Sequence, residues 1–193
     1  MDLYGRLEEL QGMTRLLIDD VGRLQGELGA GMPDPSDAQQ TNRRFYIRAV
    51  FALVEAFVEQ HRRLLVELAQ HGVIPLPEKK LLRLREMKAV TLPDGSVEEQ
   101  GQYLQLFDKI KVVYRAAGTG FGQALKVTFG DKGWTTFKDA MELRHRVTHP
   151  KKVEDCWIFE TNIQTVMAAN EWFKKLQNEF VRVARTHREA HQW

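Results

Sequence analysis

Apolar side chains recur at helical spacing along most of the chain, and three long segments show the pattern most clearly. Residues 3–28 place Thr14 or an apolar side chain at alternating steps of three and four, which is a heptad seam. Residues 41–71 have a wider apolar stripe, which predicts a helix in the centre of a bundle. A final amphipathic helix is expected at about 161–187. The pattern predicts an all-α protein.

The heptad seam needs a surface to pack against. Glycines at 12, 22 and 26 lie inside this segment, and each costs a helix roughly 0.5 to 1 kcal/mol relative to alanine. The helix is therefore expected to be marginal alone. Packing on the body of its own chain is the favoured interpretation, and an intermolecular coiled coil is the alternative.

Helix-breaking residues divide the chain further. Pro33 and Pro35 lie among Gly, Ser and Asp in residues 30–37, which predicts a domain boundary between an N-terminal helix at 1–30 and a body at 37–193. Gly72 is expected to end the central helix, and Pro150 to end a helix that starts near Trp134.

Two interpretations compete for the middle of the chain, after a short amphipathic stretch at 78–90. Pro93-Asp94-Gly95 is typical of a turn, which would join a hairpin of residues 89–91 and 96–98. Alternatively, Ser96 caps a helix with Glu99 three residues on, and that helix runs to about 116. We prefer the capped helix. The glycine-rich residues 118–122 are expected to be a connection, because neither a preceding strand nor a Gly-Lys-Ser/Thr ending supports a phosphate loop.

Four helices joined in this way predict an up-and-down four-helix bundle with an additional N-terminal helix. Of the 193 residues, 43% are apolar and 28% are charged, which is ordinary globular composition. The single Cys156, the absence of signal-peptide features after Met1 and the lack of a long apolar run predict a soluble cytoplasmic protein that does not enter a membrane. A net charge of +2 means that any nucleic-acid binding must depend on a local patch.

One short stretch, residues 144–149, contains two imidazoles, two guanidiniums and a hydroxyl, and two lysines follow it. Arginine binds phosphate oxygens in bidentate fashion, and histidine serves as an acid or a base near neutral pH. The stretch therefore predicts chemistry on a phosphodiester. The candidate catalytic residues are Arg144, His145 and His149, and the candidate RNA-binding residues are Arg146, Thr148, Lys151 and Lys152.

The geometry of an ideal helix constrains this stretch. At about 100° per residue, the side chains of Arg144 and His149 point about 140° apart, whereas His145 and His149 share a face. Either the helix unwinds at His149, which Pro150 favours, or a second copy of the chain completes the site.

The stretch resembles the HEPN superfamily motif, in which an arginine, a polar residue and three further residues precede a histidine at the end of a bundle helix. The similarity covers about residues 41–187. It implies a four-helix bundle that dimerises so that two motifs face each other, and many members are metal-independent ribonucleases of toxin–antitoxin systems. Arg144 and His149 match the motif ends. His145 occupies the polar place, where asparagine or aspartate is more usual.

The resulting hypothesis is a metal-independent endoribonuclease that cleaves single-stranded RNA at a dimeric Arg/His site, needs no cofactor, and has an antitoxin protein as a possible partner. A non-catalytic HEPN-like dimerisation or partner-binding module is the alternative. His145 and His149 also have zinc-pair spacing, but no third ligand is evident. In a purely structural role, Arg144 would form a salt bridge in the bundle and His149 would pack under the last helix.

The other basic residues are not expected to be catalytic. A second Arg-x4-His, from Arg182 to His187, is expected to be a solvated face, and His61 to be a hydrogen-bonded structural histidine. The arginines of the central helix are most simply a solvated face, and a contribution to an RNA surface is the alternative: Arg43, Arg44, Arg48, Arg62 and Arg63.

Overall fold

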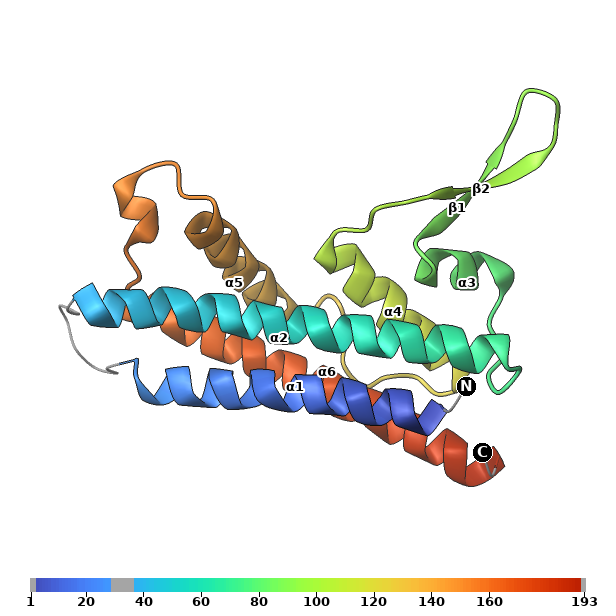
Figure 1. Ribbon diagram of the computed structural model, residues 1–193, viewed down its shortest axis with the longest axis horizontal. Helices are drawn as coiled ribbons and strands as arrows, with labels where there is room; N and C mark the ends of the chain where they lie inside the picture. The colour runs from blue at the N-terminus through green and yellow to red at the C-terminus, as the bar shows by residue number, and fades with distance from the viewer. Residues whose placement is uncertain (1–2, 29–36, 192–193) are drawn as a thin grey trace. The chain divides into compact units, whose positions relative to one another are not determined.

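The computed structural model describes residues 3–28 and 37–191, and this part of the chain is mainly helical (Figure 1). The helices are α1 (Leu3–Gly26), α2 (Asp37–Gln70), α3 (Glu78–Leu84), α4 (Leu106–Gly120), α5 (Lys132–Thr148) and α6 (Glu160–His191), with a 3-10 turn η1 (Val153–Cys156). Strands β1 (Met87–Thr91) and β2 (Val97–Gly101) form an antiparallel hairpin. The prediction of an all-α protein is confirmed only in part, because the chain is mainly helical but contains this hairpin. The up-and-down bundle stays a prediction.

Contacts divide the chain into two compact units. Unit 1 comprises residues 1–57 and 128–175, and unit 2 comprises residues 58–127 and 176–193, as far as these residues are described. The division passes through α2 and α6, so each of these helices contributes to both units. It does not follow the predicted boundary between 1–30 and 37–193, which stays a prediction about separate domains.

Unit 1 has an aromatic core at the start of α5. The carboxylate of Asp131 accepts a hydrogen bond from the backbone N–H of Trp134 at 2.7 Å and so caps this helix. The Trp134 ring stacks on Phe137 with centroids 5.7 Å apart, and the indole of Trp172 lies against both rings. A Cβ at Gly133 would overlap the Trp172 ring, so only glycine fits there without a shift.

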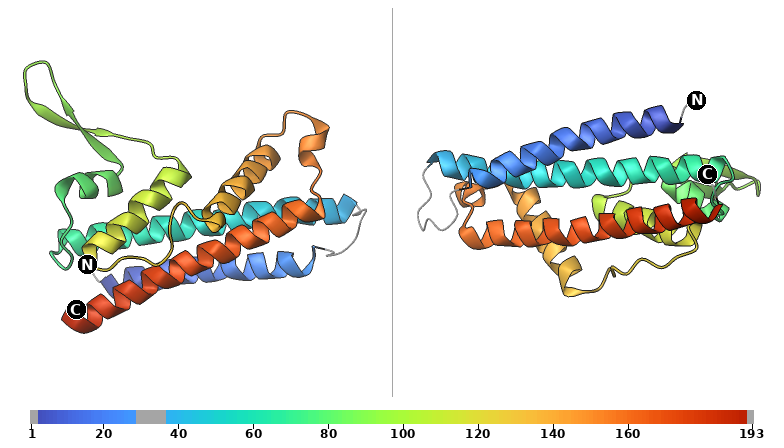
Figure 2. Two further views of the ribbon diagram at one scale, coloured as in Figure 1. Left: turned by 180° about the vertical axis from the view of Figure 1, so that it is seen from behind. Right: turned by 90° about the horizontal axis from the view of Figure 1, so that it is seen from below.

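The heptad seam of α1 faces its own chain. Thr14, Val21 and Leu28 are buried within the single chain. The last turns of α1 lie beside the first turns of α2 and run in the opposite direction (Figure 2), and Arg43 Nε on α2 donates to the Leu28 carbonyl. At these seam positions the intrachain interpretation is confirmed. The side chains of the seam before residue 12 lie outside the described residues.

Unit 2 contains the hairpin, where the preferred prediction of a capped helix is wrong. Val90 pairs with Glu98 and Thr91 with Val97, which agrees with the alternative that pairs 89–91 with 96–98. The Asp94 carboxylate accepts from both the backbone N–H and the hydroxyl of Ser96, so this serine closes a turn and does not cap a helix. The hairpin extends away from α3 and α4 (Figure 2).

The glycine-rich stretch 118–122 belongs mostly to α4, which differs from the expected connection. Gly118 and Gly120 lie in the last turn of the helix, and a Cβ at Gly120 would come within 2.8 Å of Ile74 Cδ1. The chain leaves the helix at Gly122, whose φ of +65° favours glycine. None of the helices among the described residues has the length and apolarity that crossing a bilayer requires.

Candidate functional site

The candidate site is built on the C-terminal end of α5 in unit 1. The helix ends at Thr148, and His149 has the non-helical angles φ −129° and ψ 62° while its N–H still donates to the His145 carbonyl. Pro150 explains this end, because its ring disfavours helical geometry in the residue ahead of it. Of the two alternatives from the sequence, unwinding at His149 is therefore observed, and completion of the site by a second copy stays a prediction.

Two imidazoles of one chain lie close together at this end, as their spacing of four residues predicts. His145 and His149 are both exposed, and their ring centroids lie 5.2 Å apart at an interplanar angle of 56°. Two neighbouring histidines can act as one acid and one base when one ring is protonated and the other is neutral. This arrangement requires no second copy of the chain.

Arg144 extends from α5 towards α2. Its Nη2 forms an ion pair of 2.9 Å with Glu55 Oε1, and the two side chains are 29% and 45% exposed. This pair matches the salt bridge expected for a purely structural role, although the exposure of His149 does not match the packing expected in the same interpretation. Ion pairs so open to water contribute only about 0 to 1 kcal/mol. The guanidinium can therefore exchange Glu55 for a phosphate at low cost.

Arg146 is half-buried and has unused hydrogen-bond donors. Its Nε and Nη2 are shielded from water and have no hydrogen-bond partner among the described residues. Burying such a donor unpaired costs about 1 to 3 kcal/mol, and more for a charged group. Because both atoms are shielded from solvent, a phosphate can accept from them only after the Arg146 side chain turns outward.

The remaining predicted residues differ in availability. The Thr148 hydroxyl donates to the Arg144 carbonyl at 2.8 Å, so its proton is already used within the helix. The backbone N–H groups of Lys151 and Lys152 both donate to Asp155 Oδ2, which fixes the turn into η1. Both lysine side chains are exposed. The two ammonium groups can therefore contact a polyanion, whereas the Thr148 hydroxyl is suited only to accept a hydrogen bond.

Arginines of α2 hold this end of α5 in place. The expectation of a solvated face is wrong for Arg43, which is buried, whereas Arg44 is half-buried and Arg48 is exposed. Arg48 Nη2 donates to the Val147 carbonyl at 2.9 Å, and Arg44 Nη1 donates to the Cys156 carbonyl at 3.1 Å. Arg43 is only 1% exposed and binds the Ile158 carbonyl and the Glu160 carboxylate, each at 2.8 Å. The carbonyls at a helix end and in the following connector lack backbone donors, and these guanidiniums donate the missing hydrogen bonds.

The expectation of a solvated face holds for one of the two further arginines of α2 and fails for the other. Arg62 is also bound, through Nη1 to the Leu84 carbonyl at 2.6 Å and through Nη2 to Glu59 at 2.7 Å. Arg63 is exposed as expected and pairs with Glu59. The Glu59 carboxylate is partly buried, and its hydrogen bonds and charge contacts with these two arginines outweigh that burial and lower its pKa to about 2.

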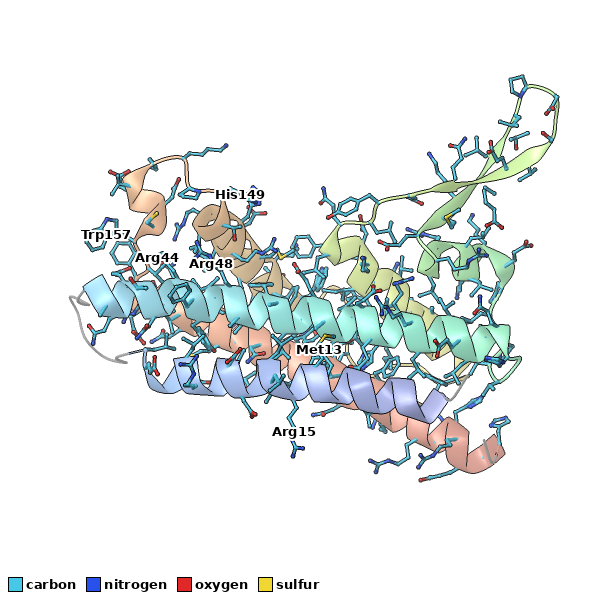
Figure 3. All side chains as sticks on the ribbon, in the orientation of Figure 1. Met13, Arg15, Arg44, Arg48, His149 and Trp157 are labelled. Carbon is cyan, nitrogen blue, oxygen red and sulfur yellow. The ribbon has the colours of Figure 1, made fainter. Side chains whose placement is uncertain are left out.

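Sequence reasoning missed Trp157 as a site residue. Its ring is 45% exposed and lies at the same end of unit 1 as Arg44, Arg48 and His149 (Figure 3). The available signal was the aromatic connector 154–159 directly after a basic stretch. An exposed indole beside cations is a surface on which a nucleobase can stack. We refer to His145, Arg146, His149, Lys151, Lys152 and Trp157, together with Arg144, as the α5-end cluster.

The competing motifs and ligands receive little support. Arg182 pairs with Glu179 and Gln123, and His187 is buried, so the expected solvated face at the second Arg-x4-His is wrong. Over residues 3–28 and 37–191, no group of three or more His, Cys, Asp or Glu side chains converges on a point suited to a metal ion. The zinc interpretation of His145 and His149 therefore still lacks a third ligand.

Comparisons with known proteins leave the family open. No family model matches the chain, and no curated protein and no solved structure is significantly similar to it. The resemblance to HEPN proteins thus depends on the motif at 144–149 alone, and the chain is described at this level as a mainly helical protein of two contact units with a small hairpin.

Proposed function

We propose that the α5-end cluster binds single-stranded RNA and cleaves it without a metal ion. The observation that carries this proposal is the pair of exposed imidazoles, His145 and His149, with ring centroids 5.2 Å apart beside arginine and lysine side chains. Such a pair suits cleavage of a phosphodiester, in which one group removes a proton from the attacking hydroxyl and another donates a proton to the leaving oxygen.

The reaction is a transesterification within the RNA strand. One imidazole removes the proton of a ribose 2′-hydroxyl, and the 2′-oxygen attacks the adjacent phosphorus. The bond from phosphorus to the 5′-oxygen breaks, and the other imidazole, in its protonated form, donates a proton to that oxygen. The products are a 2′,3′-cyclic phosphate and a 5′-hydroxyl, and water returns the two rings to their starting states.

The neighbouring cations stabilise the charge that develops on the phosphate. Arg146 contributes its Nε and Nη2 donors after its side chain turns out of the surface that shields them, and Arg144 contributes its guanidinium after releasing Glu55. Trp157 stacks a base next to the reacting phosphate. Preorganised donors of this kind typically contribute about 10²- to 10³-fold to a rate.

The resemblance to HEPN proteins supports the same chemistry and adds two proposals about assembly. Two copies of the chain would face each other across their clusters, and a small antitoxin protein would be the natural inhibitor. Because both imidazoles belong to one chain, the proposed acid and base do not need a second copy.

The test is cleavage of a fluorescent single-stranded RNA in excess EDTA, with His145→Ala and His149→Ala as variants. Each variant should lose about 10²- to 10⁴-fold in rate, because each removes an acid or a base. His71→Ala is the matched control, since His71 is an exposed histidine of unit 2 outside the cluster. DNA of the same sequence should stay intact because it lacks the 2′-hydroxyl.

The alternative of a non-catalytic binding module has a distinct outcome. Wild-type protein that binds the RNA but leaves it uncut under all buffer conditions would support that module and refute the nuclease. Loss of cleavage on adding EDTA would instead assign His145 and His149 to a metal.

A further inference from the structure

A basic cavity lies in unit 2, away from the residues of the α5-end cluster in the sequence. Its volume is about 410 Å³, and it opens between α3 and α4, which lie side by side (Figure 1). Four cationic side chains and one carboxylate line it together with apolar atoms of α4, and the charged residues are Lys80, Arg83, Lys111, Arg115 and Asp108.

Helical spacing explains how the charges converge. Lys80 and Arg83 are three residues apart on α3, and Asp108, Lys111 and Arg115 follow one another at three and four residues on α4, so each helix has one charged stripe. On α4, the fully buried Ile110 lies on roughly the opposite side of the helix from the charged stripe, and on α3 the fully buried Leu84 lies next to the stripe. Burial of these two apolar side chains fixes how each helix is turned about its axis.

Two polar contacts connect these segments around the cavity. The Lys80 ammonium donates to the Thr119 hydroxyl at the far end of α4. Lys109, one residue after Asp108, pairs at 2.9 Å with Glu86, which directly follows the α3 cap. These two contacts join the α3 segment to α4 near both ends of α4. The residues that line the cavity belong to regular helix positions.

The charge of the cavity points to its ligand. Four cations and one carboxylate give a formal charge of +3 in the lining, compared with +2 for the whole chain. An anion that enters among cationic side chains gains charge-assisted hydrogen bonds, which are stronger than those between neutral groups. Phosphoryl groups fit best, because arginine binds their oxygens in bidentate fashion and lysine binds them as a point charge.

We propose that this cavity binds a small molecule with two or more phosphoryl groups, such as pyrophosphate or a nucleoside polyphosphate. A single phosphate neutralises only part of the lining charge, whereas an oligophosphate carries enough charge to match it. A volume of about 410 Å³ is within the usual range for small-molecule sites. The side chain of Val112 provides an apolar wall for the rest of the ligand. The proposal does not depend on RNA cleavage.

The experiment is isothermal titration calorimetry of the full chain at low ionic strength with pyrophosphate, triphosphate, orthophosphate and, as a neutral probe, adenosine. Triphosphate and pyrophosphate should bind more tightly than orthophosphate, and adenosine should not bind. Arg83→Gln and Arg115→Gln should each weaken pyrophosphate binding by about tenfold, which is 1.4 kcal/mol and the low end for a charged hydrogen bond. Arg188→Gln, at an exposed arginine of α6, should leave binding unchanged.

One variant gives a gain that a misfolded protein cannot imitate. Asp108→Asn removes the Asp108 carboxylate from the lining, so it should tighten pyrophosphate binding several-fold. Absence of binding heat with every phosphate, equal affinities in wild type and the arginine variants, or no gain in Asp108→Asn would overturn the proposal. So would an RNA oligonucleotide that displaces pyrophosphate and binds more tightly, because the cavity would then be part of a nucleic-acid surface.

The proposed function is judged separately. His145→Ala should bind pyrophosphate like wild type even when RNA cleavage is lost. Conversely, pyrophosphate binding by a protein that cuts no RNA would refute only the nuclease.

Discussion

His61 shows at the level of one residue what burial does to a titratable group. Its ring stacks on Phe180 with centroids 3.8 Å apart, and Nδ1 lies 3.1 Å from the Tyr114 hydroxyl. Burial lowers the pKa of His61 to about 3 and raises the pKa of Tyr114. The sequence pattern predicted a hydrogen-bonded structural histidine here, and that prediction is confirmed.

The pKa of His61 has a direct effect on stability in acid. In the unfolded chain this histidine binds a proton near its ordinary pKa of about 6.5, whereas in the folded chain it stays neutral down to about pH 3. The unfolded state therefore binds more protons between these values, and the free energy of unfolding decreases as pH falls through that window.

We predict that His61→Phe weakens this acid sensitivity. Between pH 4 and 5, denaturant unfolding of wild type and variant should give slopes against pH that differ by about 1.4 kcal/mol per unit, the value for one proton. His71→Phe replaces an exposed histidine and should keep the wild-type slope. Parallel curves for wild type and His61→Phe would mean that His61 is not buried neutral.

At the level of elements, the connector from α5 to α6 is held by buried hydrogen bonds that no periodicity reveals. Gln40 accepts from the Ile158 N–H at 2.9 Å and donates to the Ile158 carbonyl at 3.2 Å, and Arg43 donates to the same carbonyl. A hydropathy pattern assigns arginine to solvent. It contains no information on which distant carbonyls need a donor, so the roles of the α2 arginines could not be predicted.

We predict that Arg43→Met destabilises the protein by about 2 to 4 kcal/mol, since it removes a buried charged donor from two acceptors. Urea unfolding followed by circular dichroism measures the change. Arg63→Met is the control, because Arg63 is 57% exposed and its pair with Glu59 belongs to the class worth about 0 to 1 kcal/mol. Equal losses in both variants would contradict the buried role of Arg43.

The middle of the chain was mispredicted for a local reason. Ser96 followed by Glu99 satisfies the pattern of a helix cap, but the same serine also satisfies an Asp-Gly-Ser turn. Gly95 has a φ of +86°, and its neighbours pair as strands. The helix-cap pattern and the turn pattern both fit Ser96, and the pairing of the two strands decided between them. The sequence of one segment alone does not reveal that pairing.

At the level of the whole molecule, the helix pattern predicted most of the long elements and the end of α5, whereas the contact units were not predicted. The candidate cluster at 144–149 was named from the sequence, but the pairing of Arg144 with Glu55 was not, because residues 89 apart meet only after folding. The basic cavity between α3 and α4 escaped for the same reason.

We predict a homodimer in solution. Thr14, Val21 and Leu28 are buried within the single chain, so they are not available to a second copy. Met13, Leu16 and Ile18 remain exposed on α1, and Figure 3 shows Met13 and Arg15 on this helix. Light scattering at micromolar concentration should give twice the chain mass, and Leu16→Glu should lower it if α1 is the contact.

A monomer mass for the wild type would remove the facing arrangement of two clusters that the HEPN resemblance implies. The proposed acid–base role of His145 and His149 would be unaffected, because both imidazoles belong to one chain. A dimer that persists in Leu16→Glu would place the contact on another surface.

The β1–β2 hairpin offers a way to follow this protein without disturbing it. Every residue of β2 is exposed, and the turn at Asp94 and Gly95 is exposed as well, so these side chains add nothing to either core. A short peptide epitope or a single dye inserted at this tip would meet only solvent. Such a label would travel with the intact chain through cell extracts, where it could report which nucleic acids and nucleotides accompany the protein.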